Sequence, residues 1–372
     1  MTTVVHVITA LGSGGAERTV CLVASRGNGK NDERHIVVSL MCAGIYGEEL
    51  RKAGVEVRCL DMRRGPFAAL LGFIKLVRLL WQLKPDVVMT WLYHADLFGT
   101  IAGRLAGVRR IVWNLRCSNL VFSEHPAARG WIVSLLARLS RIPDAIAANS
   151  MAGRRAHEEL GFNPKRWVYL PNGFDTAEWS PDATDRAAIR SALGFTATDF
   201  VVGRIGRIDP QKDFVTFIAA ARVAAARQPA MRILLAGEGT AELELPPDLR
   251  CVTQALGVRR DMPRLMRSLD TLVSSSAYGE GLPNVVAEAM ASAVPCVVTD
   301  VGDSAVLIGN EGIVVPARDP EALARGIEAL MAKSAEDLTA MGARARSRVS
   351  AEYSLASCLR RYAELFSGND GV

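Results

Sequence analysis

The sequence SSSAYGEGLPNVVAEAMA at residues 274–291 sets the pattern for the rest of the chain. It follows the apolar residues 271–273, as expected of a buried strand that ends at a loop. Pro283 suits the first turn of a helix, so the segment after it is predicted to be helical. Glu280 lies in the loop and Glu288 in the second turn of the predicted helix. Because a helix start offers unpaired N–H groups and a partial positive charge, this unit is a candidate phosphate site between two carboxylates.

Short apolar runs and helical segments alternate along the whole chain in the same way. The runs predicted to be strands are residues 4–9, 35–40, 55–60, 86–90, 110–114, 145–149, 168–170, 200–204, 232–235, 271–273, 295–299 and 312–315. Strands that alternate with helices are typical of a parallel α/β architecture. The breakers Pro171, Asn172 and Gly173 interrupt the alternation. We therefore predict two Rossmann-like α/β domains that meet at Asn172.

The composition fits a protein with two apolar cores. The chain has 372 residues, more than one domain usually holds, and 49% of them are hydrophobic. Its cysteines form no Cys-x-x-Cys pair, which favours reduced thiols in a cytoplasmic protein. They stand at positions 21, 42, 59, 117, 251, 296 and 358. The first ten residues lack a basic segment, so no signal peptide is expected.

The charge is unevenly distributed along the chain. Residues 1–180 carry 23 Lys and Arg against 15 Asp and Glu, a net charge of +8. Residues 181–372 carry 21 against 24, a net charge of −3. A basic first half suggests an anionic partner, such as a membrane, a nucleic acid or a phosphorylated acceptor. The sequence holds no nucleic-acid recognition motif or aromatic platform, so we expect no nucleic-acid partner.

Two helical segments in the first half combine apolar surfaces with basic residues. Residues 67–83 are too short and too charged to span a bilayer, and residues 131–142 repeat their pattern. The polar stripes are Lys75, Arg78 and Gln82 in the first segment, and Ser134, Arg138 and Arg141 in the second. Two interpretations are open: interfacial helices that lie on an anionic membrane, or ordinary helices that pack on a sheet.

Two further candidate sites follow strands of the first half. Gly14 and Gly15 allow a ligand to approach the backbone after the first strand, although a tight turn without a ligand also fits them. Glu17 stands where a dinucleotide fingerprint needs its third glycine, and the next strand ends without an acidic residue, which argues against a nicotinamide enzyme. His94 follows the strand at 86–90, where open α/β sheets bind ligands; the alternative is a structural histidine.

Several of these stretches resemble motifs of the retaining glycosyltransferases of family 4, which have the GT-B fold. The matching segments are Glu-x7-Glu at 280–288, Gly-Gly-Ala-Glu at 14–17, Pro-Asn-Gly-Phe-Asp at 171–175 and Gly-Arg…Lys at 206–212. The resemblance implies two Rossmann-like domains with parallel sheets that face an interdomain cleft. The acceptor-side domain would comprise residues 1–175, rejoined by a C-terminal helix at 353–372. The nucleotide-sugar-binding domain would comprise residues 176–352.

The resemblance also implies roles for individual residues. Arg207 and Lys212 would clamp the donor diphosphate, Glu280 would bind hydroxyls of the donor sugar, and Glu288 would bind those of the ribose. The catalytic candidates are Glu280, Arg207, Lys212, His94 and Arg116. The donor-binding candidates are Gly14, Gly15, Glu238, Gly257, Val258, Gly281, Leu282, Pro283, Asn284 and Glu288. Two positions depart from the family: Arg116 stands where many members carry a histidine, and Asp213 where a glycine is usual.

The function implied is transfer of a hexose or N-acetylhexosamine from a nucleotide-sugar, UDP-linked first and GDP-mannose next. The acceptor would be lipid-linked or a polysaccharide, in cell-envelope glycan biosynthesis at the inner face of the cytoplasmic membrane. No Asp-x-Asp follows a predicted strand, so we expect no metal and no cofactor. A nucleotide-sugar epimerase of similar fold is one alternative. A binding module whose basic half contacts nucleic acid is the other.

Overall fold

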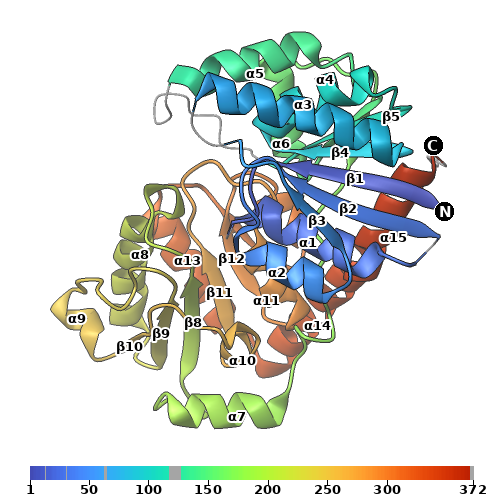
Figure 1. Ribbon diagram of the computed structural model, residues 1–372. Helices are drawn as coiled ribbons and strands as arrows, with labels where there is room; N and C mark the ends of the chain where they lie inside the picture. Colours follow the sequence, from blue (N-terminus) through green and yellow to red (C-terminus); the bar gives the residue numbers. More distant parts are fainter. Residues whose placement is uncertain (13, 31, 63–64, 117–126, 369–372) are drawn as a thin grey trace. The chain divides into compact units, whose positions relative to one another are not determined.

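The computed structural model describes residues 1–12, 14–30, 32–62, 65–116 and 127–368 (Figure 1). Cys117 therefore lies outside the described residues. Contacts between residues divide the chain into two units. The first unit comprises residues 1–172 and 358–372, and the second comprises residues 173–357. The C-terminal segment thus belongs to the same unit as the N-terminus, and each unit is described by itself below.

The first unit is built on a parallel sheet covered by helices on both faces. Among its described residues the sheet has seven strands in the order β3-β2-β1-β4-β5-β6-β7. They are β1 (Thr2–Ile8), β2 (Glu33–Ser39), β3 (Glu56–Cys59), β4 (Val87–Trp91), β5 (Arg110–Leu115), β6 (Ala145–Ala148) and β7 (Trp167–Tyr169). Val4, Val5 and Val7 of β1 are fully buried, as expected of a strand covered on both faces.

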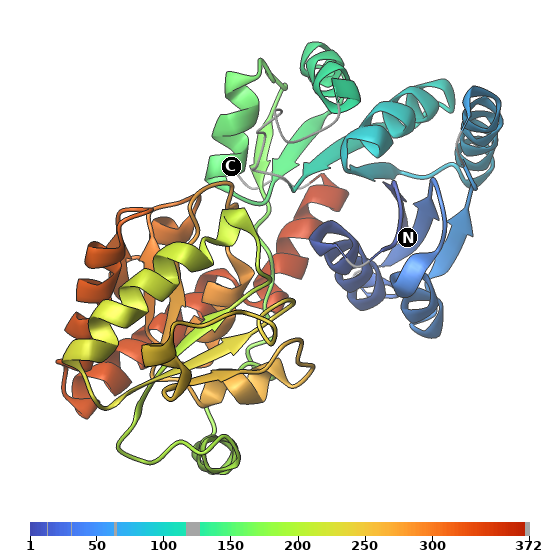
Figure 2. The ribbon, with the colours of Figure 1, turned by 90° about the vertical axis from the view of Figure 1, so that its left-hand side faces the viewer.

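The helices of the first unit form two layers (Figures 1 and 2). The apolar side chains of α1 (Gly15–Gly27), α2 (Gly44–Lys52) and α15 (Leu355–Ser367) pack with one face of the sheet. Those of α3 (Pro66–Leu83), α4 (Tyr93–Leu105) and α5 (Ala127–Leu139) pack with the other face. The helix α6 (Met151–Glu159) connects β6 to β7. No helix among the described residues is both long enough and apolar enough to cross a membrane.

The second unit repeats this architecture in residues 173–357, all of which are described. Its six parallel strands run in the order β10-β9-β8-β11-β12-β13. They are β8 (Phe200–Ile205), β9 (Met231–Ala236), β10 (Thr253–Ala255), β11 (Thr271–Ser274), β12 (Cys296–Thr299) and β13 (Gly312–Val315). The helices are α7 (Ala183–Ala192), α8 (Phe214–Arg227), α9 (Pro247–Arg250), α10 (Met262–Arg267), α11 (Asn284–Ala291), α12 (Ser304–Ile308), α13 (Pro320–Met331) and α14 (Ala335–Glu352), with the short 3-10 helix η2 (Pro210–Lys212).

The strand order locates one ligand-binding edge in each unit. In the first sheet the chain moves outward from β1 to β3 on one side and from β4 to β7 on the other. In the second sheet the same reversal lies between β8 and β11. Ligands of open parallel sheets bind beyond the carboxyl ends of the strands at such a reversal. The loops after β1, β4, β8 and β11 are therefore where candidate residues should be sought.

Several element boundaries differ from the prediction, and β10 was not predicted as a strand; two of the boundary differences concern residues singled out in the sequence. The helix predicted at 131–142 ends at Leu139, so Arg141 lies in the turn beyond it. The cause is Pro143, since the residue before a proline is disfavoured in helical conformation. Pro283 is the N-cap of α11 and not a residue of its first turn, because its ψ of 106° is extended. Arg141 thus does not continue the polar stripe of α5.

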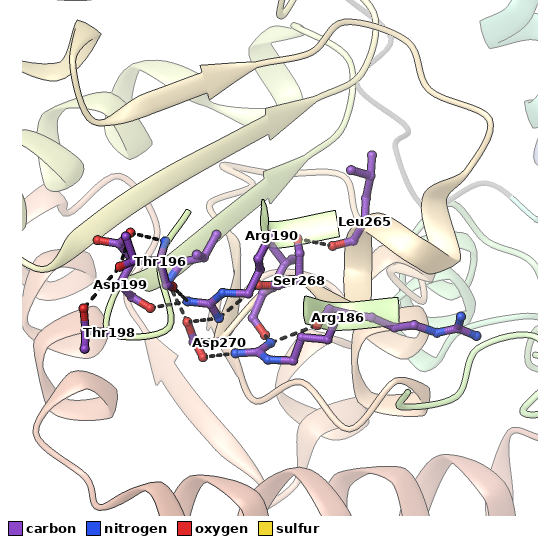
Figure 3. Close-up of polar contacts among 11 residues, drawn as sticks. Arg186, Arg190, Thr196, Thr198, Asp199, Leu265, Ser268 and Asp270 are labelled. Atoms are coloured by element: carbon purple, nitrogen blue, oxygen red, sulfur yellow. Dashed lines mark hydrogen bonds and ion pairs between the residues drawn. The ribbon is translucent and has the colours of Figure 1, made fainter. Parts of the chain in front are cut away.

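Polar contacts at the amino ends of the strands of the second sheet, opposite its ligand-binding edge, hold α7 in place (Figure 3). Asp270 precedes β11, and its Oδ1 accepts a hydrogen bond of 2.5 Å from Arg186 Nη2. Its Oδ2 accepts from Arg190 Nη1 at 3.1 Å and from the backbone N–H of Val201 at 2.7 Å. Both arginines lie on α7. One carboxylate therefore joins a helix to two neighbouring strands.

A buried chain of hydrogen bonds crosses the first sheet from β4 to β2. Trp91 Nε1 donates to His6 Nδ1 at 3.2 Å, and an indole can only donate, so the His6 proton is on Nε2. That nitrogen lies 2.8 Å from His35 Nδ1, and His35 Nε2 lies 3.0 Å from Glu33 Oε2. Because the His6 proton is on Nε2, that nitrogen donates to His35 Nδ1. Burial lowers the pKa of His6 well below its usual value, and the charge of a protonated His35 would lower it further.

This arrangement predicts acid sensitivity of the first unit. Below about pH 6.5 an unfolded histidine binds a proton that folded His6 does not, so the free energy of unfolding should fall by about 1.4 kcal/mol per pH unit for that one group. His157 is also buried with a lowered pKa and should add its own share. Urea unfolding followed by tryptophan fluorescence would measure this, since five of the six tryptophans lie in residues 1–172.

The variant His6→Gln tests the assignment to one residue. It should remove one histidine's share of the pH slope, because glutamine does not titrate. The variant His157→Gln provides the comparison, because it should remove the separate share of the other buried histidine whose pKa is lowered. An unchanged slope in His6→Gln would contradict the prediction.

Candidate active site

The loop after β8 forms a tight turn that presents Lys212. Asp209 caps the turn, since its Oδ1 accepts from Gln211 N at 2.8 Å. Lys212 ends η2, and Asp213 then adopts a left-handed conformation with φ of 47°. Aspartate tolerates this region better than most residues, and here its Oδ1 also caps α8 by accepting from Thr216 N at 3.0 Å. These two properties explain why aspartate can stand where the family usually has glycine.

Lys212 and Glu280 come together from two different loops. Lys212 Nζ donates to Glu280 Oε1 at 2.6 Å, and the side chains are 22% and 7% exposed. Ser276 Oγ donates to the same carboxylate oxygen at 2.5 Å. The pair lies beyond the carboxyl ends of β8 and β11, where the strand order reverses. The sequence placed both residues among the catalytic candidates but did not predict a direct contact.

Arg204 is a buried residue beneath this pair that sequence reasoning missed. It is 1% exposed, and its guanidinium lies 4.5 Å from the centre of the Phe214 ring. Nε donates to Ser275 Oγ at 3.1 Å, and Nη2 donates to the carbonyl oxygen of Lys212. Burial lowers the pKa of Arg204 to about 10, although the charges of Glu280 and Asp213 act to raise it. Arg204 therefore fixes the backbone at Lys212 from below.

The loop that carries Glu280 is held on both sides by neighbouring loops. Gln211 Nε2 donates to the Gly279 carbonyl at 3.0 Å, and Ala277 N donates to the Gln211 carbonyl at 2.9 Å. On the other side Gly302, with φ of 64°, packs so closely that an added Cβ would lie 2.2 Å from the Glu280 carbonyl oxygen. The loop is therefore preorganised by main-chain contacts.

The other candidates of the second unit lie along the same edge. Arg207 is 57% exposed, and its Nε donates to Asp209 Oδ2 at 3.0 Å. Glu238 is exposed, and its carbonyl accepts from Ile208 N at 2.9 Å. Gly257, with φ of 65°, accepts from Gly237 N at 2.8 Å and places Val258 in solvent. Main-chain hydrogen bonds thus join the loop after β8 to the loop after β9, and the loop after β9 to the loop after β10.

The start of α11 holds the remaining donor-binding candidates. Gly281 precedes it, with a carbonyl that accepts from Asp303 N at 2.9 Å. Leu282 is buried, and Pro283 is the N-cap. Asn284 is the first helical residue and Glu288 the fifth, and both are half-buried. The helix start therefore lies directly after the loop of Glu280, as the spacing predicted.

The candidates of the first unit lie at the carboxyl edge of its own sheet. Gly14 caps α1, and Gly15 is its first residue; both are exposed. His94 is the second residue of α4 and is exposed. It follows Leu92, whose φ of 72° lies in the region that favours glycine. Such a conformation costs about 1–3 kcal/mol and is found most often at functional sites.

Arg116 has several partners within the first unit. Its Nη2 donates to Asn172 Oδ1 at 2.5 Å and to Thr19 Oγ1 at 3.2 Å. Its Nη1 donates to the hydroxyl of Tyr362 at 3.2 Å, and the guanidinium lies 5.6 Å from the centre of the Trp91 ring. Any anion that binds at Arg116 must share it with these groups.

The arrangement is suited to bind an anion and to stabilise further negative charge that develops on it. Lys212 has three ammonium donors, of which one contacts Glu280, and Arg207 presents a guanidinium fork to solvent. The helix start at Asn284 adds backbone N–H groups. Among the described residues, no group of three His, Cys, Asp or Glu side chains gathers in a way that could hold a metal ion.

The fold defines the class of protein. The crystal structure of Anabaena HepE in complex with UDP superposes with a TM-score of 0.85 at 22% identity. The match covers 99% of this chain and 100% of that chain. The chain therefore has the GT-B fold of glycosyltransferases, two Rossmann-like units with parallel sheets. The predicted fold class is confirmed.

Two family models then identify the family. The model described as Glycosyltransferase Family 4 matches residues 7–178, and the model described as Glycosyl transferases group 1 matches residues 199–333. The chain belongs to the family 4 glycosyltransferases, which confirms the resemblance found in its sequence motifs.

Curated relatives match over part of their length. The chain is 26% identical over 255 residues to the UDP-Gal:alpha-D-GlcNAc-diphosphoundecaprenol alpha-1,3-galactosyltransferase of Escherichia coli, a match that covers 64% of each chain. It is 29% identical over 245 residues to the D-inositol 3-phosphate glycosyltransferase of Geodermatophilus obscurus, over 60% of this chain and 53% of the relative. The chain thus spans less than two thirds of the length of these relatives.

Proposed function

We propose that the protein is a retaining, metal-independent glycosyltransferase that moves a hexose or N-acetylhexosamine from a UDP-sugar to a lipid-linked acceptor. The contact between Lys212 and Glu280 carries the proposal. The contact brings together a cation, which would hold the diphosphate, and a carboxylate, which would bind the sugar, at the reversal of the second sheet, and neighbouring loops hold both in position. GDP-mannose is the second choice of donor, and a polysaccharide the second choice of acceptor.

The residues of the second unit would act on the leaving diphosphate. As the bond from the anomeric carbon to the diphosphate oxygen breaks, negative charge grows on that oxygen. Lys212, Arg207 and the N–H groups at the start of α11 would stabilise it. The acceptor hydroxyl would form the new bond on the same face of the sugar, and its proton would pass to the departing diphosphate. Glu280 uses Oε1 for Lys212 and Ser276, so Oε2 would meet the sugar hydroxyls.

The choice of substrates is supported by similar proteins. The Escherichia coli relative is named for UDP-Gal and for an acceptor with a diphosphoundecaprenol group. The Anabaena structure has been solved with UDP and with UDP-glucose. A lipid diphosphate acceptor would also suit the basic first half of the chain. We therefore propose that the protein works in the cytoplasm, peripherally at the inner face of the membrane, in cell-envelope glycan biosynthesis.

A thermal-shift panel of UDP-, GDP- and ADP-sugars tests the donor. A ligand at a hundred times its Kd stabilises the folded protein by about 2.7 kcal/mol, which raises the melting temperature measurably. We expect a shift with UDP-sugars, of equal size in EDTA and in magnesium. A shift only with magnesium would overturn metal independence, and a shift only with GDP-mannose would change the donor.

Product analysis tests the reaction itself. With a UDP-sugar and a lipid diphosphate sugar acceptor, NMR of the product should show the anomeric configuration of the donor. Omission of the acceptor should abolish turnover of the donor sugar. An altered nucleotide-sugar formed without acceptor would instead identify an epimerase.

A further inference from the structure

The solvent side of α3 is apolar. Phe67, Leu70, Leu71, Ile74 and Trp81 are all exposed, Phe67 to 72% and Trp81 to 64%. Their spacing places them on one side of the helix, while Leu76 and Leu80 face the sheet and are fully buried. Large apolar side chains gathered on one exposed helix face mark an interaction surface.

The apolar surface continues onto the two neighbouring helices. The helix α4 packs against α3 on one side and α5 on the other (Figure 1). Ile101 and Leu105 of α4 are 43% and 66% exposed, and Trp131 of α5 is 60% exposed. We call the solvent side of α3, α4 and α5 the docking face.

The exposed charged side chains on these helices are all positive. Lys75 and Arg78 on α3 and Arg138 on α5 are exposed. The one carboxylate in the three helices is Asp96, which is fully buried and accepts a hydrogen bond from Thr90 Oγ1 at 2.6 Å. Such a surface complements an anionic membrane: the apolar side chains match the lipid interior, and the cations match the negatively charged head groups.

A hollow at the end of α3 adds to this match. It has a volume of about 470 Å³ and is lined by Trp81, Lys84 and Arg109, together with one carboxylate, Asp86, whose Oδ2 accepts a hydrogen bond from Thr3 N at 2.8 Å. The indole thus stands beside two cationic side chains. Tryptophan is enriched where a membrane meets water, and Lys and Arg there bind phosphate head groups.

We propose that the docking face lies on an anionic membrane surface, with Phe67, Trp81 and Trp131 inserted among the lipids. A second copy of the chain fits less well, because a symmetric contact would bring Lys75 and Arg78 of one copy against those of the other. The membrane instead supplies both the apolar and the anionic partner. The docking face would thus hold the protein at the interface between the membrane and water.

The position of His94 gives the docking face a function, and this step rests on the proposed lipid-linked acceptor. His94 is the second residue of α4, the middle helix of the docking face. Phe67 is the second residue of α3, so both residues lie at the carboxyl edge of the first sheet. A lipid-linked acceptor held in the same membrane would meet the protein at that edge.

Vesicle co-sedimentation tests the proposal without any sugar transfer. Wild type should bind vesicles made of equal parts phosphatidylcholine and phosphatidylglycerol, and should bind phosphatidylcholine alone much more weakly. Salt at about 1 M should weaken the binding, because it shortens the screening length to about 3 Å. Equal binding to both vesicles, or none to either, would overturn the proposal.

Two double variants separate the apolar and the charged contributions. Lys75→Glu with Arg78→Glu should weaken partitioning at least about 25-fold, since each cation near an anionic surface contributes a factor of about 5. Phe67→Ser with Trp81→Ser should weaken it by about 10-fold for each ring. The matched controls are Arg325→Glu with Lys333→Glu, and Val215→Ser, all exposed in the second unit. An equal loss in the controls would overturn the assignment to this face.

Two readouts separate this inference from its alternatives. Transfer to a short-chain, water-soluble acceptor analogue should be unchanged in both double variants, so loss of vesicle binding and loss of catalysis are distinguishable. If no transfer is found with wild type, the proposed function fails while the vesicle result still stands. If sedimentation shows a dimer that Phe67→Ser with Trp81→Ser dissociates, the face is an interface between copies and the membrane proposal is wrong.

Discussion

Replacement of Lys212 by alanine should slow sugar transfer by roughly 100- to 1,000-fold, the effect of removing one preorganised donor to a developing anion. The ammonium group of Lys212 is held 2.6 Å from Glu280 Oε1. The main chain of Lys212 is held by Arg204, which donates to its carbonyl oxygen. The ammonium group therefore needs little reorganisation when charge grows on the diphosphate. Initial rates at saturating donor and acceptor would measure the loss in kcat.

A second effect of Lys212→Ala must be separated from the first. Glu280 is 7% exposed, so its carboxylate would lose its cationic partner while buried, and the protein should become less stable by about 1–3 kcal/mol. The double variant Lys212→Met with Glu280→Gln removes both charges and should regain most of this stability. It should stay inactive if Lys212 acts on the diphosphate.

The surface lysine Lys52 provides the control for these variants. Its Nζ lies 2.9 Å from Glu48 in an exposed pair on α2. Lys52→Ala should change stability by less than about 1 kcal/mol, as exposed pairs do, and should leave the transfer rate unchanged. Recovery of transfer in the double variant would mean that the Lys212–Glu280 contact is structural.

The sequence was sufficient to predict the alternation of strands and loops. Parallel strands are buried on both faces, so they are continuous apolar runs, as at 271–273 and 4–9. The run at 271–273 is followed by three serines, and the run at 200–204 is followed within two residues by Gly206, where the chain leaves the sheet. Lys212 and Glu280 stand in such loops, which is why motif spacing alone could nominate both.

Contacts between distant residues could not be predicted in this way. Arg204 follows a glycine in a predicted strand, and nothing local shows that its guanidinium lies on Phe214 and donates to Lys212. The chain from Trp91 to Glu33 depends on the register in which β1 pairs with β2 and β4. These partners are set by the assembled sheets and not by neighbours in sequence.

The sequence also could not predict which face of α3 is exposed to solvent. The helix is apolar around most of its circumference, so its periodicity did not show which apolar side packs on the sheet. The stripe of Lys75, Arg78 and Gln82 suggested where solvent lies but not that Trp81 and Phe67 flank it. Packing against α4 and the sheet decides this.

The variant Asp270→Ala should lower the free energy of unfolding of the second unit by about 3 kcal/mol. Loss of one partner from a buried ion pair costs about 3–5 kcal/mol, and the 19% exposure of Asp270 favours the lower end. Arg190 is 8% exposed and would lose the carboxylate of its salt bridge, and the N–H of Val201 would lose its acceptor. Figure 3 shows both arginines directed at this one carboxylate.

Calorimetry should detect the change. For a unit of this size, 1 kcal/mol corresponds to about 2–4 °C in melting temperature, so the transition of the second unit should fall by about 6–12 °C. Asp270 precedes β11 and lies at the amino edge of the sheet, whereas Lys212 and Glu280 lie at the carboxyl edge. Below the transition the variant should therefore keep the kcat and the donor KM of wild type.

Asp248→Ala is the matched control for this prediction. Asp248 also pairs with an arginine of the second unit, Arg222, at 2.9 Å, but the two side chains are 52% and 55% exposed. Water can replace the lost partner there, so the cost should be below about 1 kcal/mol. If both variants lost the same stability, burial would not be what makes Asp270 important. If Asp270→Ala lost activity without losing stability, the attachment of α7 would instead act on the donor site across the sheet.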